Sequence, residues 1–358
     1  MKIGILTQPL TTNYGGILQN YALQTVLKNL GHEPKTIDYI VYTWKDWYIY
    51  TLKNLIKKLL GRQCYFISTP SRELKKEIPL RRFVCNNISL TAPRKKSFTA
   101  SLIEKYNFDA VVVGSDQVWR PSYNADRIED MYLAFTQGLS VRRVAYAASF
   151  GTDEWEYTQE STNICSVLAK KIDAISVREL TGVELCKRYL GVTAAHVLDP
   201  TMLLTSLDYE MICKDIERRE PFVFAYMLDI SSEKRQIVES IAKSRGLTYI
   251  IVSAGNDISE NDSIELWLSY FRDCSFVVTD SFHGTVFSII FNRDFIVCGN
   301  QSRGNARFHS LLDIFHLQNR MIISDQELPP LSIDWDAVKV ILNTRRIESI
   351  EWLNSALC

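Results

Sequence analysis

The feature that most constrains this chain is an alternation of short apolar segments with amphipathic helical segments. Residues 2–7 (KIGILT) predict a buried strand, and residues 36–40 (TIDYI) predict a second one. Between them, apolar residues recur near the helical period over 17–31, and Gly31 suits a C-terminal helix stop. This order of elements is typical of a βαβ unit, so the chain opens as an α/β fold.

The alternation continues to the C-terminus in two series. In the first series we expect helices near 157–171 and 179–189, with strands at 109–114, 144–149, 173–177 and 194–198. A second series begins after Pro200. It has a helix at 232–245, a buried helix containing 286–291, and strands at 222–228, 247–253, 276–280 and 294–299.

Two domains are the natural count for 358 residues. We predict an N-terminal domain over 1–205 and a C-terminal domain over 206–334. A last helical segment, 335–358, is expected to pack back on the N-terminal domain.

Composition excludes several classes of function. Lys+Arg and Asp+Glu balance at 41 each, so there is no overall basic field for nucleic acid. The eight cysteines form no C-x-x-C pair, and no metal-ligand cluster is visible. No signal-peptide core follows Ile3–Leu6, and no segment approaches the roughly 20 apolar residues of a membrane span. We therefore expect a cytoplasmic protein without a bound metal.

One insert, 44–82, departs from the alternation. It is aromatic at its start and carries ten Lys/Arg against three Asp/Glu. Within it, 51–62 predicts a basic amphipathic helix. Such a helix can pack its apolar face on the domain, or residues 44–62 can contact the inner face of an anionic plasma membrane.

The turns between strands and helices hold the first candidate site residues. Asn13, Tyr14, Gly15 and Gly16 follow the first strand, where small residues let the backbone approach a ligand. Asp116 follows the strand at 109–114 and can accept hydrogen bonds from sugar hydroxyls or act as a base. The alternatives are a tight turn for the first segment and a helix cap for Asp116.

Arginines mark two further turns. Arg178 follows a strand and can hold a phosphate or carboxylate, or form a local ion pair. Arg303 and Arg307 bracket a loop before a helix and are candidates for the same task, or a solvated pair.

The segment DSFHG (280–284) is the strongest candidate for chemistry. A strand delivers Ser281 and His283 to a turn, and Gly284 opens a very apolar helix. Histidine is the side chain most easily tuned to transfer a proton near neutral pH. The helix N-terminus favours an anion beside it.

Taken in order, these segments resemble the polysaccharide pyruvyl transferase family over nearly the whole chain. The motifs that carry the resemblance are NYGGILQNYALQ, VVVGSDQVW, YAASFG, SVRE, LDPTMLL and DSFHG. The resemblance implies two facing Rossmann-like domains, similar to the glycosyltransferase B architecture. It also implies transfer of a pyruvyl group from phosphoenolpyruvate to two hydroxyls of a glycan sugar, as a ketal, with phosphate release.

The resemblance also implies roles for individual residues. The family histidine corresponds to His283, for proton transfer, and the SVRE arginine to Arg178, for the donor. Many members have an arginine two residues before that histidine, where this chain has Ser281. Arg303 and Arg307 are the candidates to compensate, with backbone N–H groups near Gly284. Asp116 and the Asn13–Gly16 segment would position the acceptor, a glycan or lipid-linked sugar, and no cofactor is required.

Two other functions fit the same pattern. A glycosyltransferase with a nucleotide-sugar donor is one, although no acidic ribose-holding residue is visible in the second domain. A non-catalytic glycan-binding protein of the same fold is the other, and Ser281 is its best support.

Overall fold

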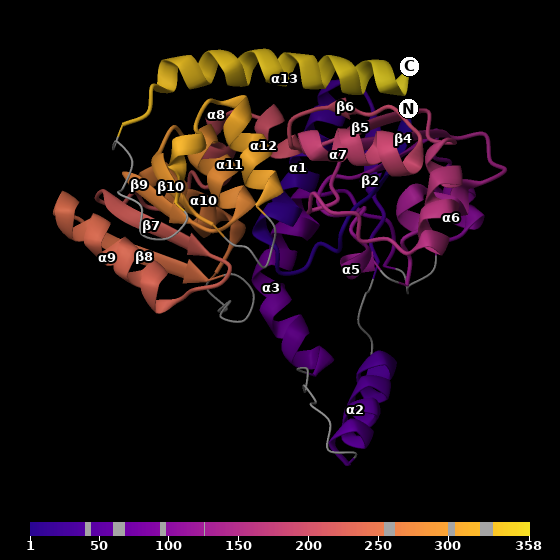
Figure 1. The fold of residues 1–358 in the computed structure, drawn as a ribbon, viewed down its shortest axis with the longest axis horizontal. Helices are drawn as coiled ribbons and strands as arrows, with labels where there is room; N and C mark the ends of the chain where they lie inside the picture. Colours follow the sequence, from indigo (N-terminus) through magenta and orange to yellow (C-terminus); the bar gives the residue numbers. More distant parts are fainter. Residues whose placement is uncertain are drawn as a thin grey trace.

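The protein contains two parallel β-sheets, each flanked by helices (Figure 1). The computed structural model describes residues 1–39, 44–59, 69–93, 98–124, 126–253, 262–299, 305–322 and 332–358. This arrangement confirms the predicted fold class, two Rossmann-like domains in the glycosyltransferase B architecture. Within the described residues, no helix combines the length and apolar character needed to cross a bilayer.

The first sheet has six parallel strands. Their order is β2 (Glu33–Thr36), β1 (Lys2–Leu6), β3 (Ala110–Val113), β4 (Arg142–Ala148), β5 (Ala174–Val177) and β6 (Ala195–His196). Its helices are α1 (Tyr14–Asn29), α4 (Ala100–Tyr106), α5 (Pro121–Asn124), α6 (Gln159–Ala169) and α7 (Leu180–Leu185). All four residues of β3 are buried, because successive side chains point into cores on opposite faces of the sheet.

The second sheet has five parallel strands. Their order is β11 (Met321–Ile322), β10 (Asp294–Cys298), β9 (Phe276–Thr279), β7 (Phe222–Met227) and β8 (Thr248–Ser253). Its helices are α8 (Ser206–Ile212), α9 (Ser232–Arg245), α10 (Ile264–Asp273), α11 (Phe282–Ile290) and α12 (Ala306–Ile314). The helix predicted at 232–245 is confirmed, with Ser231 as its N-cap and Gly246 in the left-handed conformation after it.

The two sheets share one hydrophobic core. Residues of β1, β3 and β4 belong to the same cluster as residues of β7, β9 and β10, with α1, α10 and α11 between them. The first half of the molecule contains the six-stranded sheet, and the second half contains the five-stranded sheet. Helix α13 (Trp335–Leu357) lies along one side of both halves (Figure 1). Near its start Trp335 donates to Asp294 of β10, and near its end Arg142 of β4 donates to the Ala356 carbonyl. The division at residues 205 and 206 stays a prediction.

Several predicted elements have different bounds in the structure. The strand expected at 36–40 is β2, Glu33–Thr36, because its ladder ends level with Ile5 of β1. The helix expected at 17–31 already begins at Tyr14, so Gly15 and Gly16 are helical. The helix expected at 179–189 is α7 followed by a π-helical turn at Cys186–Leu190.

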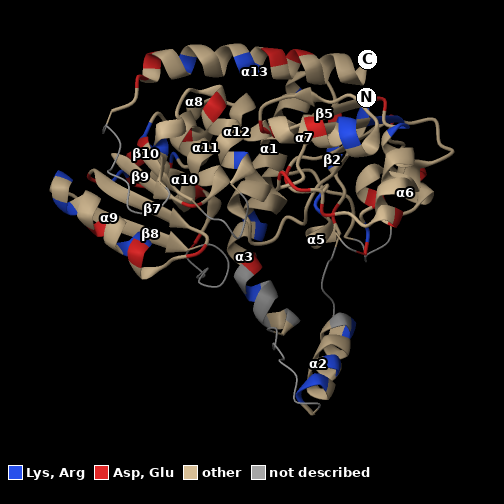
Figure 2. Ribbon diagram, in the orientation of Figure 1, with Lys and Arg blue, Asp and Glu red and all other residues tan. Residues whose placement is uncertain are grey.

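The basic insert contains two helices, α2 (Trp44–Leu59) and α3 (Pro70–Asn87). Helix α2 projects away from both sheets (Figures 1 and 2). The predicted basic helix at 51–62 falls on α2 as far as Leu59, and residues 60–62 lie outside the described residues.

Candidate functional site

A pocket of about 320 Å³ lies between the two halves of the molecule. The first half contributes side chains from loops and helix starts after β1 and β3, and the second half from the ends of β7 and β9 and from α12. The lining residues are Gln8, Thr12, Asn13, Asp116, Gln117, Tyr123, Tyr226, Leu228, Ser281, Phe282, His283 and Arg307. The carboxyl ends of parallel strands therefore form the site, as expected for open α/β sheets.

The start of α11 brings His283 to the pocket. Ser281 is the N-cap of this helix, and its hydroxyl accepts the Gly284 N–H at 3.3 Å. A Cβ on Gly284 would lie 2.2 Å from Thr279 Oγ1, so this glycine allows the helix to pack closely against β9. This cap occupies the Gly284 N–H, and anion binding by other backbone N–H groups near Gly284 stays a prediction.

Asp280 stabilises the same turn through contacts with residues that follow β7. Its carboxylate accepts from Asp229 N at 3.1 Å, from Leu228 N and from Lys234 Nζ at 2.6 Å. These bonds tie the end of β9 to the end of β7. Asp280 therefore fixes the turn that carries His283.

The start of α1 meets His283 from the other half. Asn13 caps α1 by accepting the Gly16 N–H at 3.1 Å, and its Nδ2 donates to Asp116 at 3.3 Å. A Cβ on Gly15 would lie 2.0 Å from His283 Nδ1. The glycine is thus required for the close approach of helix and imidazole. Of the predicted segment 13–16, only Asn13 lines the pocket.

Tyr14 lies in an aromatic cluster rather than on the pocket wall. Its ring stacks on Trp267 with a centroid distance of 5.4 Å and meets Tyr226 edge-on with a centroid distance of 6.1 Å. Tyr14 is only 1% exposed. Burial raises the pKa of its hydroxyl well above the usual value. The structure gives Tyr14 a packing role between the halves, in place of the predicted contact with an acceptor.

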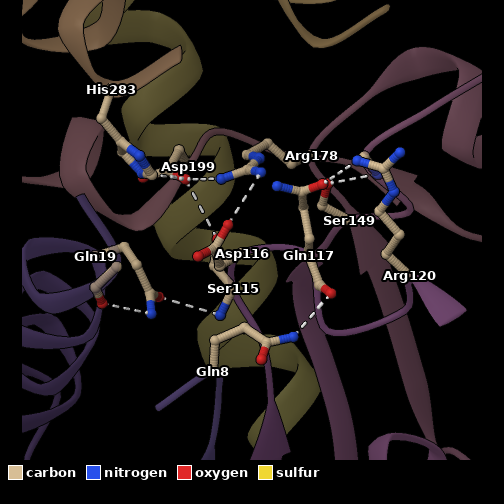
Figure 3. Close-up of polar contacts among 12 residues, drawn as sticks. Gln8, Gln19, Ser115, Asp116, Gln117, Arg120, Ser149, Arg178, Asp199 and His283 are labelled. Atoms are coloured by element: carbon tan, nitrogen blue, oxygen red, sulfur yellow. Dashed lines mark hydrogen bonds and ion pairs between the residues drawn. The ribbon is translucent and has the colours of Figure 1, made fainter. Parts of the chain in front are cut away.

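Arg178 and Asp199 form a buried ion pair beside His283 (Figure 3). Arg178 Nη1 donates to Asp199 Oδ2 at 2.7 Å, and Arg178 Nη2 lies 3.8 Å from Asp116 Oδ1. His283 Nε2 lies 3.7 Å from the same Asp199 oxygen. Asp199 therefore connects an arginine of the first half to the histidine of the second.

The charges around Asp199 keep it ionised. Burial alone would raise its pKa, but His283, Arg178 and the Thr201 hydroxyl hold the pKa of Asp199 well below the usual range. The net shift of Glu179 has the opposite direction, because burial raises its pKa and outweighs the opposing effect of Arg178.

Phe282 lies against two guanidinium groups. The Arg178 guanidinium is 4.3 Å from the ring centroid, and that of Arg307 is 5.9 Å away. Burial, followed by repulsion from Arg178, lowers the pKa of Arg307 to about 10. Arg307 lines the pocket, whereas Arg178 is 4% exposed and is not part of the lining. Arg303, the other candidate, lies outside the described residues.

Sequence reasoning missed Asp199, whose only signal was its place in the LDPTMLL segment. The polar residues Ser115 and Gln19, which are linked to Asp199 by hydrogen bonds, were missed as well. Ser115 donates to Asp199 at 3.3 Å, and Gln19 of α1 accepts the Ser115 N–H at 3.2 Å (Figure 3). Within the described residues, no group of three His, Cys, Asp or Glu could hold a metal ion.

A Gly15→Ala substitution is expected to reduce activity by displacing His283. The added Cβ cannot coexist with Nδ1 at 2.0 Å, so the imidazole or α1 must move. Gly299→Ala is the matched control, since Gly299 does not line the pocket and its Cβ would lie 3.3 Å from the flexible end of the Met321 side chain. Turnover and melting temperature of both variants should be compared. Equal turnover of the two variants would contradict the proposed contact.

The fold and the position of the pocket define a two-domain protein of the glycosyltransferase B architecture. The sequence profile of the family described as "Polysaccharide pyruvyl transferase" matches residues 13–302, most of the chain. The chain therefore belongs to the polysaccharide pyruvyl transferase family, as the sequence motifs predicted, and it is a transferase.

Solved structures also resemble the chain over nearly its full length. UDP-GlcNAc 2-epimerase from Neisseria meningitidis, bound to UDP-GlcNAc, has 10% identity and a TM-score of 0.47, covering 100% of this chain and 94% of its own. The putative UDP-N-acetylglucosamine 2-epimerase from Listeria monocytogenes has 11% identity and a TM-score of 0.48, and the match covers 99% of this chain and 90% of the epimerase chain. Spinosyn rhamnosyltransferase has 13% identity and a TM-score of 0.38, covering 99% and 95%. No curated protein matches the chain in sequence.

Proposed function

We propose that the protein transfers a pyruvyl group from phosphoenolpyruvate to two hydroxyls of one glycan sugar, forming a ketal and releasing phosphate. The observation that carries the proposal is the meeting of His283 with Asp199, Arg178 and Arg307 at a pocket between the domains. This set offers a proton donor and positive charge in one place, as an enol phosphate donor requires.

In the proposed reaction, His283 gives a proton to the methylene carbon of phosphoenolpyruvate. The central carbon then carries positive charge, and one sugar hydroxyl bonds to it and loses its proton. Phosphate leaves with the electron pair of its C–O bond. The second hydroxyl bonds to the same carbon and loses its proton, which closes the ketal. Of the two hydroxyl protons, one restores His283 and the other leaves with the phosphate.

Charge holders for the donor come from both halves. Arg307 and Ser281 both line the pocket, and Arg307 would bind the phosphate or carboxylate. Arg178 lies against the Phe282 ring, outside the pocket lining, and would act by pairing with Asp199 and Asp116 and holding both carboxylates in place. Asp199 is a positioning residue in this scheme, because its carboxylate lies 3.7 Å from His283 Nε2 and would orient the imidazole.

The acceptor would lie on the side of Asp116 and Asn13. Their side chains form one hydrogen-bonded pair at the pocket wall, and Asp116 can accept from a sugar hydroxyl. We propose an acceptor glycan destined for an exopolysaccharide or capsule, carried on a lipid, and a cytoplasmic reaction that uses no cofactor besides its donor.

Thermal shift measurements test the donor. Phosphoenolpyruvate is expected to raise the melting temperature of the protein, since a ligand of the native state stabilises it. An Arg307→Met variant should lose this shift, whereas the exposed Arg188→Met should keep it. The complementary assay is phosphate release with a glycan acceptor. A shift with a nucleotide sugar instead of phosphoenolpyruvate would indicate a glycosyltransferase, and glycan binding without phosphate release would indicate a non-catalytic protein.

A further inference from the structure

Helix α2 projects away from both sheets (Figure 1), and it presents an apolar stripe to solvent. Helices of soluble domains normally bury such a stripe against a core. Here the exposed large apolar side chains are Trp44, Tyr48, Ile49, Tyr50, Leu52, Leu55, Ile56 and Leu59. Most of them recur at spacings of three and four residues, so they share one face. The polar Asn54 is 3% exposed, so the helix covers a polar position and exposes apolar ones.

The exposure of this face argues against one of the two interpretations of the insert, in which the apolar face packs on the domain. A helix packed on its own domain would have Leu52 and Leu59 buried, yet they are 60% and 87% exposed. The stripe is therefore available to a surface outside the molecule.

The charges on α2 select the kind of surface. Lysines occur near both ends of α2, which carries several basic positions in Figure 2. Lys45 lies near its start, and Lys53, Lys57 and Lys58 lie in its second half. Asp46 is the one acidic residue in the sequence of the helix. A positive apolar helix complements an anionic surface that can also take up apolar side chains.

Aromatic residues at the start of α2 point to the same kind of surface. The ring centroids of Trp44 and Trp47 lie 5.6 Å apart, and those of Trp47 and Tyr48 lie 5.1 Å apart. Trp and Tyr are enriched where a membrane meets water, because one end of each ring system is apolar and the other polar. A helix of 16 residues is about 24 Å long at 1.5 Å per residue, so it fits in the plane of the interface.

We propose that α2 is a docking element for the anionic surface of a lipid bilayer. The apolar stripe lies among the acyl chains just below the headgroups, and the lysines contact lipid phosphates. This goes beyond the proposed transferase chemistry, since docking does not depend on which group the site transfers. In the cell it would hold the pocket near an acceptor carried on a lipid.

Vesicle sedimentation with the full-length protein tests the docking. Binding is expected to vesicles of phosphatidylglycerol and phosphatidylcholine, to be at least tenfold weaker to phosphatidylcholine alone, and to fall with added salt. Two triple variants should each reduce vesicle binding at least tenfold. The first reverses the charges of α2 (Lys53→Glu, Lys57→Glu and Lys58→Glu). The second makes its apolar stripe polar (Leu52→Ser, Ile56→Ser and Leu59→Ser). The control is Lys187→Glu with Arg188→Glu and Lys214→Glu, which makes the same charge change at exposed residues elsewhere.

The outcomes separate docking from catalysis. Both α2 variants should keep the melting temperature and the phosphate release seen with a water-soluble glycan, because α2 contributes no residue to the pocket. Vesicle binding that is equal in wild type and α2 variants would overturn the proposal. An apolar stripe that instead pairs two copies of the chain, seen as a dimer in light scattering that the serine variant abolishes, would overturn it as well.

Discussion

Replacing His283 with alanine is expected to lower turnover by about 10²- to 10⁴-fold, the usual contribution of a positioned acid or base. The imidazole lines the pocket and lies 3.7 Å from an ionised Asp199. No other histidine lines this pocket among the described residues, so none can substitute there. Phosphate release at saturating phosphoenolpyruvate with a glycan acceptor measures the effect.

The loss should fall on turnover rather than on donor binding. Proton transfer is an interaction of the transition state, so kcat and kcat/KM should decrease together. The thermal shift produced by phosphoenolpyruvate should remain, because Arg307 is intact. His309→Ala, at an exposed position of α12, is the matched control and should behave as wild type. A His283→Ala enzyme with near-normal turnover would remove His283 from the mechanism.

The fold could be predicted because its signals are local. In α9, the serine before the helix and the glycine after it mark both ends, and the spacing of apolar residues marks its buried face. The position of His283 was predictable for a related reason. A turn after a parallel strand must lie at the carboxyl edge of the sheet, where ligands bind.

The contacts that complete the site could not be predicted, because they join distant parts of the chain. Asp199 and His283 are paired across the two halves, and no spacing rule relates them. Burial of Arg178 behind Phe282 depends on how α11 meets the end of β5. Gly15 was predicted to bring backbone close to a ligand, and the structure uses it to bring the backbone close to the imidazole.

Replacing Arg178 with methionine is expected to lower the free energy of unfolding by about 3–5 kcal/mol, the usual cost of removing one partner of a buried ion pair. Arg178 is 4% exposed and lies 2.7 Å from Asp199, 3.5 Å from Glu179 and 3.8 Å from Asp116. Its loss leaves these carboxylates without their buried cation. Denaturant unfolding measures the change, and Arg188→Met at an exposed site is the control.

The pH dependence of this loss identifies its cause. In the wild type the pKa of Asp199 is lowered in the folded state, so its contribution to stability is present above its unfolded pKa and disappears as the pH falls. Without Arg178, the folded-state pKa of Asp199 rises, and protonation relieves the unpaired charge. The stability difference between variant and wild type should therefore become smaller as the pH is lowered from neutral into the acidic range, through the raised pKa of Asp199. A difference that stays constant over this range would mean that lost packing against Phe282, rather than unpaired charge, destabilises the variant. Arg178→Lys separates the two causes further, since it restores a positive charge without the planar contact to the ring.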